Sequence, residues 1–275
     1  MQPMMTQHKP SLQEQLQQIL QHQHYIRHIT HLTSTDSTNQ EAMRQARQGM
    51  ASGRVWIADQ QTAGRGRLGR TWHTMPQSLA MSIMLRPPCP AEHMPQLSLV
   101  TAVALHEALT HYSDEVRIKW PNDVWIQGKK VSGILTEMCT QGRQVDAIIL
   151  GIGVNIAAPE AGWPEDIAQQ VTDIQSHYPH TVSRVQLAQR ILQSLDTWYA
   201  CFLKQGFAPI RQAWWHAHIA SGQYVRAASA QGYIEGIAQA LDDDGALLVY
   251  ADGITHRISS GEVLLSPNKT ETTAS

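Results

Sequence analysis

Along most of the chain, short apolar runs alternate with longer stretches in which apolar residues recur every three or four positions. The first pattern is typical of strands and the second of helices. Strands are predicted at 27–32, 55–58, 79–85, 116–120, 124–126, 131–138 and 147–156, and helices at 38–49, 97–109, 184–204 and 208–218. Because the two kinds of element mix without regular βαβ alternation, we predict an α+β fold with flanking helices and a largely antiparallel or mixed sheet, in preference to a doubly wound fold.

The texture of the sequence changes after Gly222. Five short apolar runs follow, separated by turn signals such as Asp242-Asp243-Asp244-Gly245 and Asp252-Gly253. Closely spaced short strands predict a small all-β domain, and a barrel would hide its edges. We therefore divide the chain into a leader (1–27), a larger domain (28–219), a small β domain (220–267) and a tail (268–275). Apolar residues at helical spacing in the leader favour a short helix, and a flexible tail is the alternative.

Composition excludes several classes of protein. The formal net charge of the 275 residues is −2, so no overall basic field attracts nucleic acid or an anionic membrane. Cys89, Cys139 and Cys201 are widely spaced, which indicates neither a disulfide framework nor a thiolate zinc site. Since the chain has neither a signal-peptide pattern nor an apolar run of membrane-spanning length, we expect an unexported protein of the cytoplasm.

The segment Gly64-Arg65-Gly66-Arg67-Leu68-Gly69-Arg70 is the densest chemical signal. Glycines let the backbone approach a ligand, and guanidinium groups grip oxyanions, so the loop predicts a phosphate or carboxylate site. A solvated basic loop is the alternative. The segment also falls one residue short of the P-loop pattern G-x-x-x-x-G-K-[ST]. We reject a P-loop because Arg70 replaces the lysine and the chain continues into a strand instead of a helix.

Two further polar segments lie at predicted strand ends. The segment 119–123 is interpreted as presenting a cation, the aromatic ring of Trp120 and a carboxamide–carboxylate pair together. Pro121 keeps Trp120 out of the helical region, and Asp123 could hold a metal or a phosphate-bound water. Lys130 enters a strand toward Gly133 and could present a fixed cation on the concave face of the sheet. An ordinary turn and a solvated lysine pair are the alternatives.

Ser37, Thr38 and Asn39 precede a predicted helix. Thr38 and Glu41 form the T-x-x-E pattern of a capping box, so the helix is predicted to start there. Capping alone explains the hydroxyl groups. The same hydroxyls could also face a ligand at the helix start.

Several motifs together resemble those of biotin protein ligases. They are Ser37-Thr38-Asn39, Gln61, GRGRLGR at 64–70, KWPND at 119–123, GKKVSGIL at 128–135 and GIGVNI at 151–156. The resemblance covers roughly 28–267, and independent motifs occur in the family's order. It implies a class II synthetase-like biotin/lipoate ligase domain followed by an SH3-like barrel.

The resemblance also implies residue roles. Ser37, Thr38, Asn39 and Gln61 would line a biotin pocket that Trp72 helps to cover. Arg65 and Arg67 would close over the adenylate, with Arg70 as support, and Lys130 would contact the reacting carboxylate and α-phosphate. Asp123 is a candidate for steering or deprotonating the acceptor amine. It is also the candidate residue for binding Mg²⁺. The other ligand-binding positions carried over are Gly64, Gly66, Lys119, Asn122, Gly133 and Asn155.

The implied activity is the ATP- and Mg²⁺-dependent conversion of biotin to biotinyl-5'-AMP. Biotin then passes to a lysine of the biotin carboxyl carrier protein of acetyl-CoA carboxylase or a related carboxylase. A homodimer is possible. Residues 1–27 are too few for the helix-turn-helix domain of family members that repress transcription, so we expect neither DNA nor membrane binding.

Three other functions are weighed against this one. Lipoate ligases and octanoyl transferases share the architecture but are not expected to combine GRGRLGR with KWPND. A pure biotin-binding module would not need Lys130. A kinase or another P-loop enzyme would release ADP instead of AMP.

Overall fold

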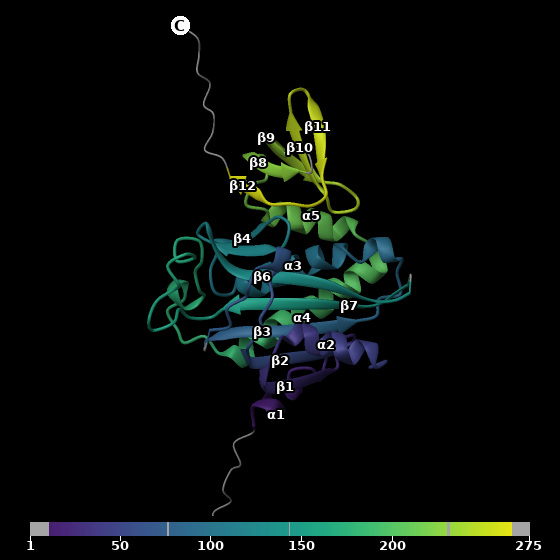
Figure 1. The fold of residues 1–275 in the computed structure, drawn as a ribbon, viewed down its shortest axis with the longest axis vertical. Helices are drawn as coiled ribbons and strands as arrows, with labels where there is room; N and C mark the ends of the chain where they lie inside the picture. The colour runs from purple at the N-terminus through teal and green to yellow at the C-terminus, as the bar shows by residue number, and fades with distance from the viewer. Residues whose placement is uncertain (1–10, 76, 143, 230–231, 266–275) are drawn as a thin grey trace, which may run out of the picture.

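The computed structural model describes residues 11–75, 77–142, 144–229 and 232–265. Its larger sheet has the order β1-β2-β3-β7-β6-β5-β4. The strands are β1 (His28–Thr35), β2 (Arg54–Gln61), β3 (Ser78–Leu85), β4 (Val116–Lys119), β5 (Asp123–Ile126), β6 (Lys129–Gln141) and β7 (Gln144–Asn155). β1 and β2 are parallel and the other pairs are antiparallel, which confirms the predicted mixed sheet (Figure 1).

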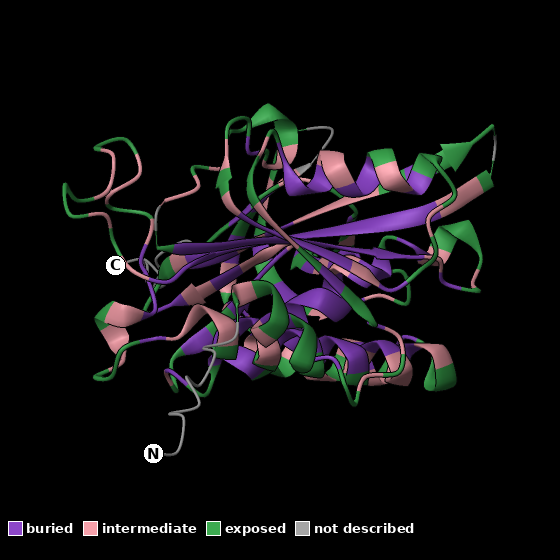
Figure 2. Cartoon of the chain, turned by 90° about the horizontal axis from the view of Figure 1, so that it is seen from below, coloured by how far each residue is buried: buried purple, intermediate pink, exposed green. Residues whose placement is uncertain are grey.

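Helices cover both faces of this sheet (Figures 1 and 2). They are α1 (Leu12–Gln18), α2 (Thr38–Arg47), α3 (Gln96–Leu109), α4 (Arg184–Gln205) and α5 (Ala208–Ala217), and the 3-10 turns are η1 (Arg67–Gly69), η2 (Ala91–His93) and η3 (Gln175–His177). The main core lies between the sheet and α3, α4 and α5, and α2 seals a smaller core with Trp56 and Ile149. β3, in the middle of the sheet, is buried along its whole length. An apolar strand suits this place because both of its faces are covered.

The start of α2 was predicted correctly, but the predicted capping box of Thr38 and Glu41 does not form. Ser37 is the N-cap and makes no side-chain capping bond, whereas Thr38 is the first helical residue. The backbone N–H and hydroxyl of Thr38 both donate to Gln61 Oε1, at 2.8 and 3.1 Å. Glu41 instead accepts hydrogen bonds from Arg44 and Gln45. The start of α2 is therefore held by Gln61 at the end of β2. The hydroxyl groups of Ser37 and Thr38 face the site described below.

The leader contributes α1, which covers the outer edge of β1. The Gln13 amide donates to Ile29 O and accepts from His31 N–H, and Gln17 makes the same pair of bonds with Arg27 O and Ile29 N–H. Two side chains one helical turn apart thus replace a neighbouring strand along an edge that would otherwise be unpaired. Residues 1–10 of the leader lie outside the described residues, as do the tail residues 268–275.

The second sheet is antiparallel with the order β11-β10-β9-β8-β12. Its strands are β8 (Tyr224–Ser229), β9 (Gly232–Leu241), β10 (Leu247–Ala251), β11 (Ile254–Ile258) and β12 (Val263–Leu265), which confirms the predicted five-stranded all-β unit. It stands beyond α5 in Figure 1. Trp120 is buried here, with Nε1 donating to Gly245 O at 3.3 Å. The interpretation that presents Trp120 together with the polar residues of its motif is therefore wrong, because its ring packs against the second sheet.

His218 is buried between the two sheets and gives folding a pH dependence. Its Nδ1 lies 3.0 Å from Ile118 O, and its ring stacks on Trp214. Burial lowers the pKa of His218 from 6.5 to about 4, so the folded protein keeps the ring neutral. The unfolded chain binds a proton near pH 6.5, and stability is therefore lost as the pH falls from there toward 4.

We expect the free energy of unfolding in urea to fall by about 2 kcal/mol between pH 7 and pH 5 through His218 alone. The variant His218→Asn places an amide N–H at the same δ position, so it can still donate to Ile118 O, but it cannot titrate. Its unfolding free energy should lose that part of the pH dependence. An identical pH slope in the wild type and the variant would rule out His218 as its source.

No helix among the described residues is both long and apolar enough to cross a membrane.

Candidate active site

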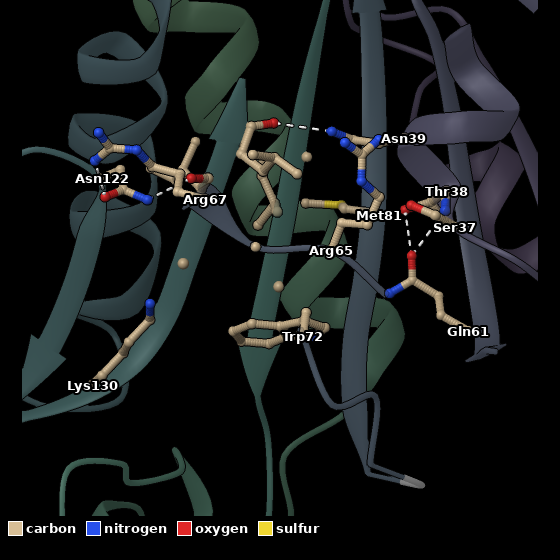
Figure 3. Close-up of a pocket in the computed structure, with 17 residues that line it drawn as sticks. Ser37, Thr38, Asn39, Gln61, Arg65, Arg67, Trp72, Met81, Asn122 and Lys130 are labelled. Atoms are coloured by element: carbon tan, nitrogen blue, oxygen red, sulfur yellow. Dashed lines mark hydrogen bonds between the residues drawn. The ribbon is translucent and has the colours of Figure 1, made fainter. Parts of the chain in front are cut away.

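A cleft of about 450 Å³, partly open to solvent, lies over β3, β6 and β7, beside the start of α2 (Figure 3). Its lining residues are Ser37, Thr38, Asn39, Gln61, Arg65, Gly66, Arg67, Trp72, Met81, Asn122, Lys130, Gly133, Ile134, Leu135, Gly151, Ile152 and Gly153. Figure 3 shows Ser37, Thr38 and Gln61 on one side, Lys130 and Asn122 on the other, and Trp72 between them. The cleft thus has a polar amide and hydroxyl side and a cationic side.

Glycines on two neighbouring strands make room in the cleft. Gly133 of β6 pairs with Gly153 of β7. A Cβ at Gly153 would lie 2.4 Å from the ring of Trp72, and one at Gly151 would lie 2.2 Å from Asn39 Oδ1. Since real Cβ atoms do not approach this closely, Trp72 and Asn39 occupy their positions only because these strand residues lack side chains.

The amide and hydroxyl side of the cleft is buried and preorganised. Ser37, Thr38 and Asn39 are each less than 5% exposed. Gln61 accepts from Thr38 and donates through Nε2 to Thr74 Oγ1 at 2.9 Å. A few fixed polar groups in a partly apolar pocket can orient a small ligand and discriminate between ligands.

The glycine-rich loop closes on itself above the cleft. Arg65 and Thr71 form an antiparallel bridge, Gly66 N–H donates to Arg70 O at 2.7 Å, and Trp72 N–H donates to Gly64 O at 3.0 Å. A Cβ at Gly64 would lie 2.3 Å from Trp72 O, so this position requires glycine. The loop leads into β3, which bears out the rejection of a P-loop.

Both inner arginines of the loop are held by partners. Arg65 Nη1 lies 3.1 Å from Glu137 Oε1, and Arg67 Nη1 donates to Asn122 Oδ1 at 2.8 Å. Asn122 is itself fixed by donating to Ile134 O at 2.7 Å. Burial lowers the pKa of Arg67, which the charge of Asp123 partly offsets. An arginine remains cationic at neutral pH, so both guanidinium groups present positive charge to the cleft.

Lys130 supplies a third cation. Its Nζ lies 2.7 Å from Asp123 Oδ1, across the β5–β6 pair. Its backbone is fixed by Lys130 N–H donating to Gln170 O and by Thr172 N–H donating to Lys130 O. The lysine therefore lies in the wall of the cleft with its charge oriented by a carboxylate.

Five residues predicted for the site do not line the cleft: Gly64, Arg70, Lys119, Asp123 and Asn155. As described above, Gly64 allows the loop to close on Trp72, and Asp123 orients Lys130. Arg70 reaches Glu262 of the second sheet's last loop at 3.1 Å. Lys119 is buried with Nζ 4.3 Å from the centroid of the Trp125 ring, and burial lowers its pKa. Asn155 Nδ2 donates to Thr172 O. These five residues lie around the cleft without lining it.

Sequence reasoning missed several lining residues: Met81, Ile134, Leu135, Gly151, Ile152 and Gly153. The two glycines carried a usable signal, because alternate glycines inside an apolar strand mark a close approach by another group. Glu137 and Ser82, which bond to lining residues, carried no such signal. Among the described residues, no cluster of three or more histidine, cysteine, aspartate or glutamate side chains is arranged to hold a metal.

Two family models match the chain. Residues 30–155 match the biotin/lipoate A/B protein ligase family, and residues 220–266 match the biotin protein ligase C terminal domain. The chain is 34% identical over 215 residues to the bifunctional ligase/repressor BirA of Bacillus subtilis, covering 78% of this chain and 66% of that relative. It is 38% identical over 217 residues to a biotin–[acetyl-CoA-carboxylase] ligase of Paracoccus denitrificans, covering 77% of this chain and 90% of the relative.

Solved structures agree with the sequence matches. A biotin protein ligase from Aquifex aeolicus, in complex with biotin and ATP, superposes with a TM-score of 0.75 at 29% identity, covering 88% of this chain and 99% of that one. A biotin protein ligase from Leishmania major with biotinyl-5-AMP gives a TM-score of 0.58 at 25% identity, covering 85% and 99%. The fold, the two matched domains and the aligned relatives together show that this chain belongs to the biotin protein ligases of the biotin/lipoate A/B protein ligase family.

Proposed function

We propose that this protein joins biotin to ATP, releasing pyrophosphate, and transfers biotin from biotinyl-5'-AMP to a lysine of a biotin carboxyl carrier protein. The acceptor would belong to acetyl-CoA carboxylase or a related carboxylase. The observation that carries the proposal is the cleft itself: a glycine-floored pocket with buried amide and hydroxyl groups is lined by three cations, Arg65, Arg67 and Lys130. The Aquifex aeolicus relative in complex with biotin and ATP supports it.

The polar side of the cleft would take the ring system of biotin. Ser37, Thr38, Asn39 and Gln61 offer hydroxyl and amide groups that match the donors and acceptors of a ureido ring. Met81 and Ile152 provide apolar contact, and Trp72 lies across the glycine floor. The carboxylate of the valerate chain would then reach the cationic side.

Adenylation requires two anions to meet, because the carboxylate oxygen attacks the α-phosphorus of ATP and pyrophosphate leaves. Lys130, Arg65 and Arg67 would neutralise the charge that develops on the α-phosphate oxygens. Asp123 would keep Lys130 in place through the 2.7 Å contact. Preorganised cations reduce the barrier because they need no reorientation during the reaction.

Mg²⁺ is a proposed partner of ATP in this cleft. In nucleotide sites Mg²⁺ usually binds one or two carboxylates together with phosphate oxygens and waters. Asp123 fits this pattern, because its carboxylate lies beside the cationic side of the cleft. The ion would add positive charge to the phosphates.

In the second half-reaction the acceptor amine attacks the carbonyl carbon of biotinyl-5'-AMP. The bond to AMP breaks, AMP leaves with the electron pair, and the attacking nitrogen gives up a proton. Asp123 stays our prediction for steering or deprotonating that amine. The glycine-rich loop would exclude water from the mixed anhydride until the acceptor arrives.

Cytoplasmic location, a homodimer and the absence of DNA binding stay predictions. A lipoate ligase or octanoyl transferase is the second candidate, because the family model that matches 30–155 includes lipoate enzymes. The match to a biotin protein ligase C terminal domain favours biotin.

The proposal is tested by measuring AMP and pyrophosphate with MgATP, a biotin carboxyl carrier domain, and biotin, lipoate or octanoate as the acid. We expect AMP release that depends on biotin, together with a mass increase of the carrier by one biotinyl group. Turnover with lipoate alone would move the protein to the second candidate, and ADP as the product would contradict both.

A further inference from the structure

Glu137 does not line the cleft itself, but it bonds to two residues that do, Arg65 and Asn39. Gly133 and Leu135 line the cleft from β6, and Glu137 follows on the same face because side chains alternate along a strand. One of its oxygens, Oε1, lies 3.1 Å from Arg65 Nη1. The other, Oε2, accepts from Asn39 Nδ2 at 2.8 Å. One carboxylate therefore joins the glycine-rich loop to the start of α2.

Asn39 is a rigid anchor for this carboxylate. It is 4% exposed, and Nδ2 also donates to Leu135 O at 3.1 Å. Its Oδ1 accepts from Ser82 Oγ at 2.6 Å, and Ser82 is fully buried in β3. Ser82 Oγ in turn lies 2.7 Å from Thr38 Oγ1. Every polar atom of the Asn39 amide is therefore bonded, and Glu137 Oε2 is held by a network rooted in the sheet.

Arg65 has much weaker support of its own. Its side chain is 46% exposed and comes from a loop, whereas Glu137 is 23% exposed and comes from a central strand. Exposed ion pairs generally contribute little to stability, so this pair is a poor candidate for a fold-stabilising contact. Its effect is directional: the anchored carboxylate limits where the Arg65 guanidinium can lie above the cleft.

We propose that Glu137 is a positioning residue, which holds the guanidinium of Arg65 over the cleft and thereby ties the loop to the polar side of the pocket. This inference rests on the proposed adenylation, because there Arg65 meets the carboxylate of the acid and the α-phosphate of ATP. Glu137 acts only through Arg65. Removing Glu137 should therefore matter while Arg65 is present and should matter little once Arg65 is gone.

The test is a double-mutant cycle of Glu137→Gln and Arg65→Ala, read as kcat/KM for biotin-dependent AMP formation. Gln is nearly isosteric with Glu and can still accept from Asn39, so the variant keeps the fold and loses the charge that orients Arg65. We expect Glu137→Gln to lower kcat/KM by about tenfold in the wild-type background and by less than about twofold in the Arg65→Ala background. Glu235→Gln removes an ion pair with Arg226 in the second sheet and should leave activity unchanged.

Amide hydrogen exchange of the loop 64–72 in the ligand-free protein gives a readout that does not depend on the reaction. Exchange should be several-fold faster in Glu137→Gln and unchanged in Glu235→Gln, because only the first variant loosens the loop. An equal loss of activity from Glu137→Gln in both backgrounds, or unchanged activity and loop exchange, would overturn the proposal. If the wild type forms no biotin-dependent AMP, the proposed function fails, and the exchange result still decides whether Glu137 holds the loop.

Discussion

Replacing Lys130 with alanine is expected to lower the rate of biotinyl-5'-AMP formation by about a hundredfold to a thousandfold, the usual cost of losing a preorganised charge at a reacting oxyanion. Its Nζ is fixed by Asp123 at 2.7 Å in the wall of the cleft. Water entering the vacated space would solvate the phosphate only after reorganising. Single-turnover release of pyrophosphate from ATP, with biotin in excess, measures this step directly.

Lys129→Ala is the matched control for Lys130→Ala. Lys129 precedes Lys130 on β6, is exposed and does not line the cleft. Successive side chains of a strand point to opposite faces, so this variant loses the same charge on the other side of the sheet. We expect its rate to stay within about twofold of the wild type, since exposed charges of this kind are screened. Equal losses from both variants would show that net charge, not the position of Lys130, matters.

The sequence predicted the elements well wherever one local rule was sufficient. Apolar runs located the strands of the larger sheet, and the turn signals after Gly222 located the five short strands. The capping box failed because Thr38 bonds to Gln61, a residue on another strand, in preference to Glu41 three positions away. Trp120 likewise turned toward Gly245, which lies far along the chain. Tertiary partners decided both cases, and a local pattern contains no information about them.

The candidate site shows the same division. Motifs that carry arginine, lysine and glycine were visible because few folds need those residues in that order. Glu137 and Ser82 were not, because an isolated glutamate or serine in a strand has many ordinary uses. Their contacts with Asn39 cross from β6 and β3 to α2. A single sequence gives no register between strands so distant along the chain, so only the structure reveals the network.

The contact between Arg70 and Glu262 was also beyond sequence reasoning. Arg70 ends the glycine-rich loop, and Glu262 precedes β12 in the second sheet. Lys119 Nζ lies 3.9 Å from another oxygen of the same carboxylate. One carboxylate just before β12 therefore contacts both the end of the glycine-rich loop and Lys119, which gives the small β unit a physical route to influence the site.

A side chain at position 153 is expected to weaken the binding of biotin. A Cβ there would lie 2.4 Å from the ring of Trp72, so either the ring or the strand must move. A Trp72 ring displaced into the cleft would obstruct biotin, and a binding penalty of about 1–3 kcal/mol, the size of a typical overpacking cost, corresponds to a rise of about tenfold to a hundredfold in the KM for biotin with Gly153→Val. Gly153→Ala should give a smaller rise. The KM for ATP should change less, because the three nearest atoms that a Cβ at position 153 would meet all belong to the Trp72 ring.

Ala240→Val adds comparable bulk to β9 of the second sheet and serves as the control for Gly153→Val. Biotin titrations followed by calorimetry, together with thermal unfolding, separate loss of the pocket from loss of the fold. A valine at 153 that leaves the biotin affinity unchanged would show that the acid binds elsewhere in the cleft. Weaker biotin binding with an unchanged unfolding temperature would instead place the biotin ring against the glycines of β7. Only a local obstruction of the pocket lowers the biotin affinity without lowering the unfolding temperature.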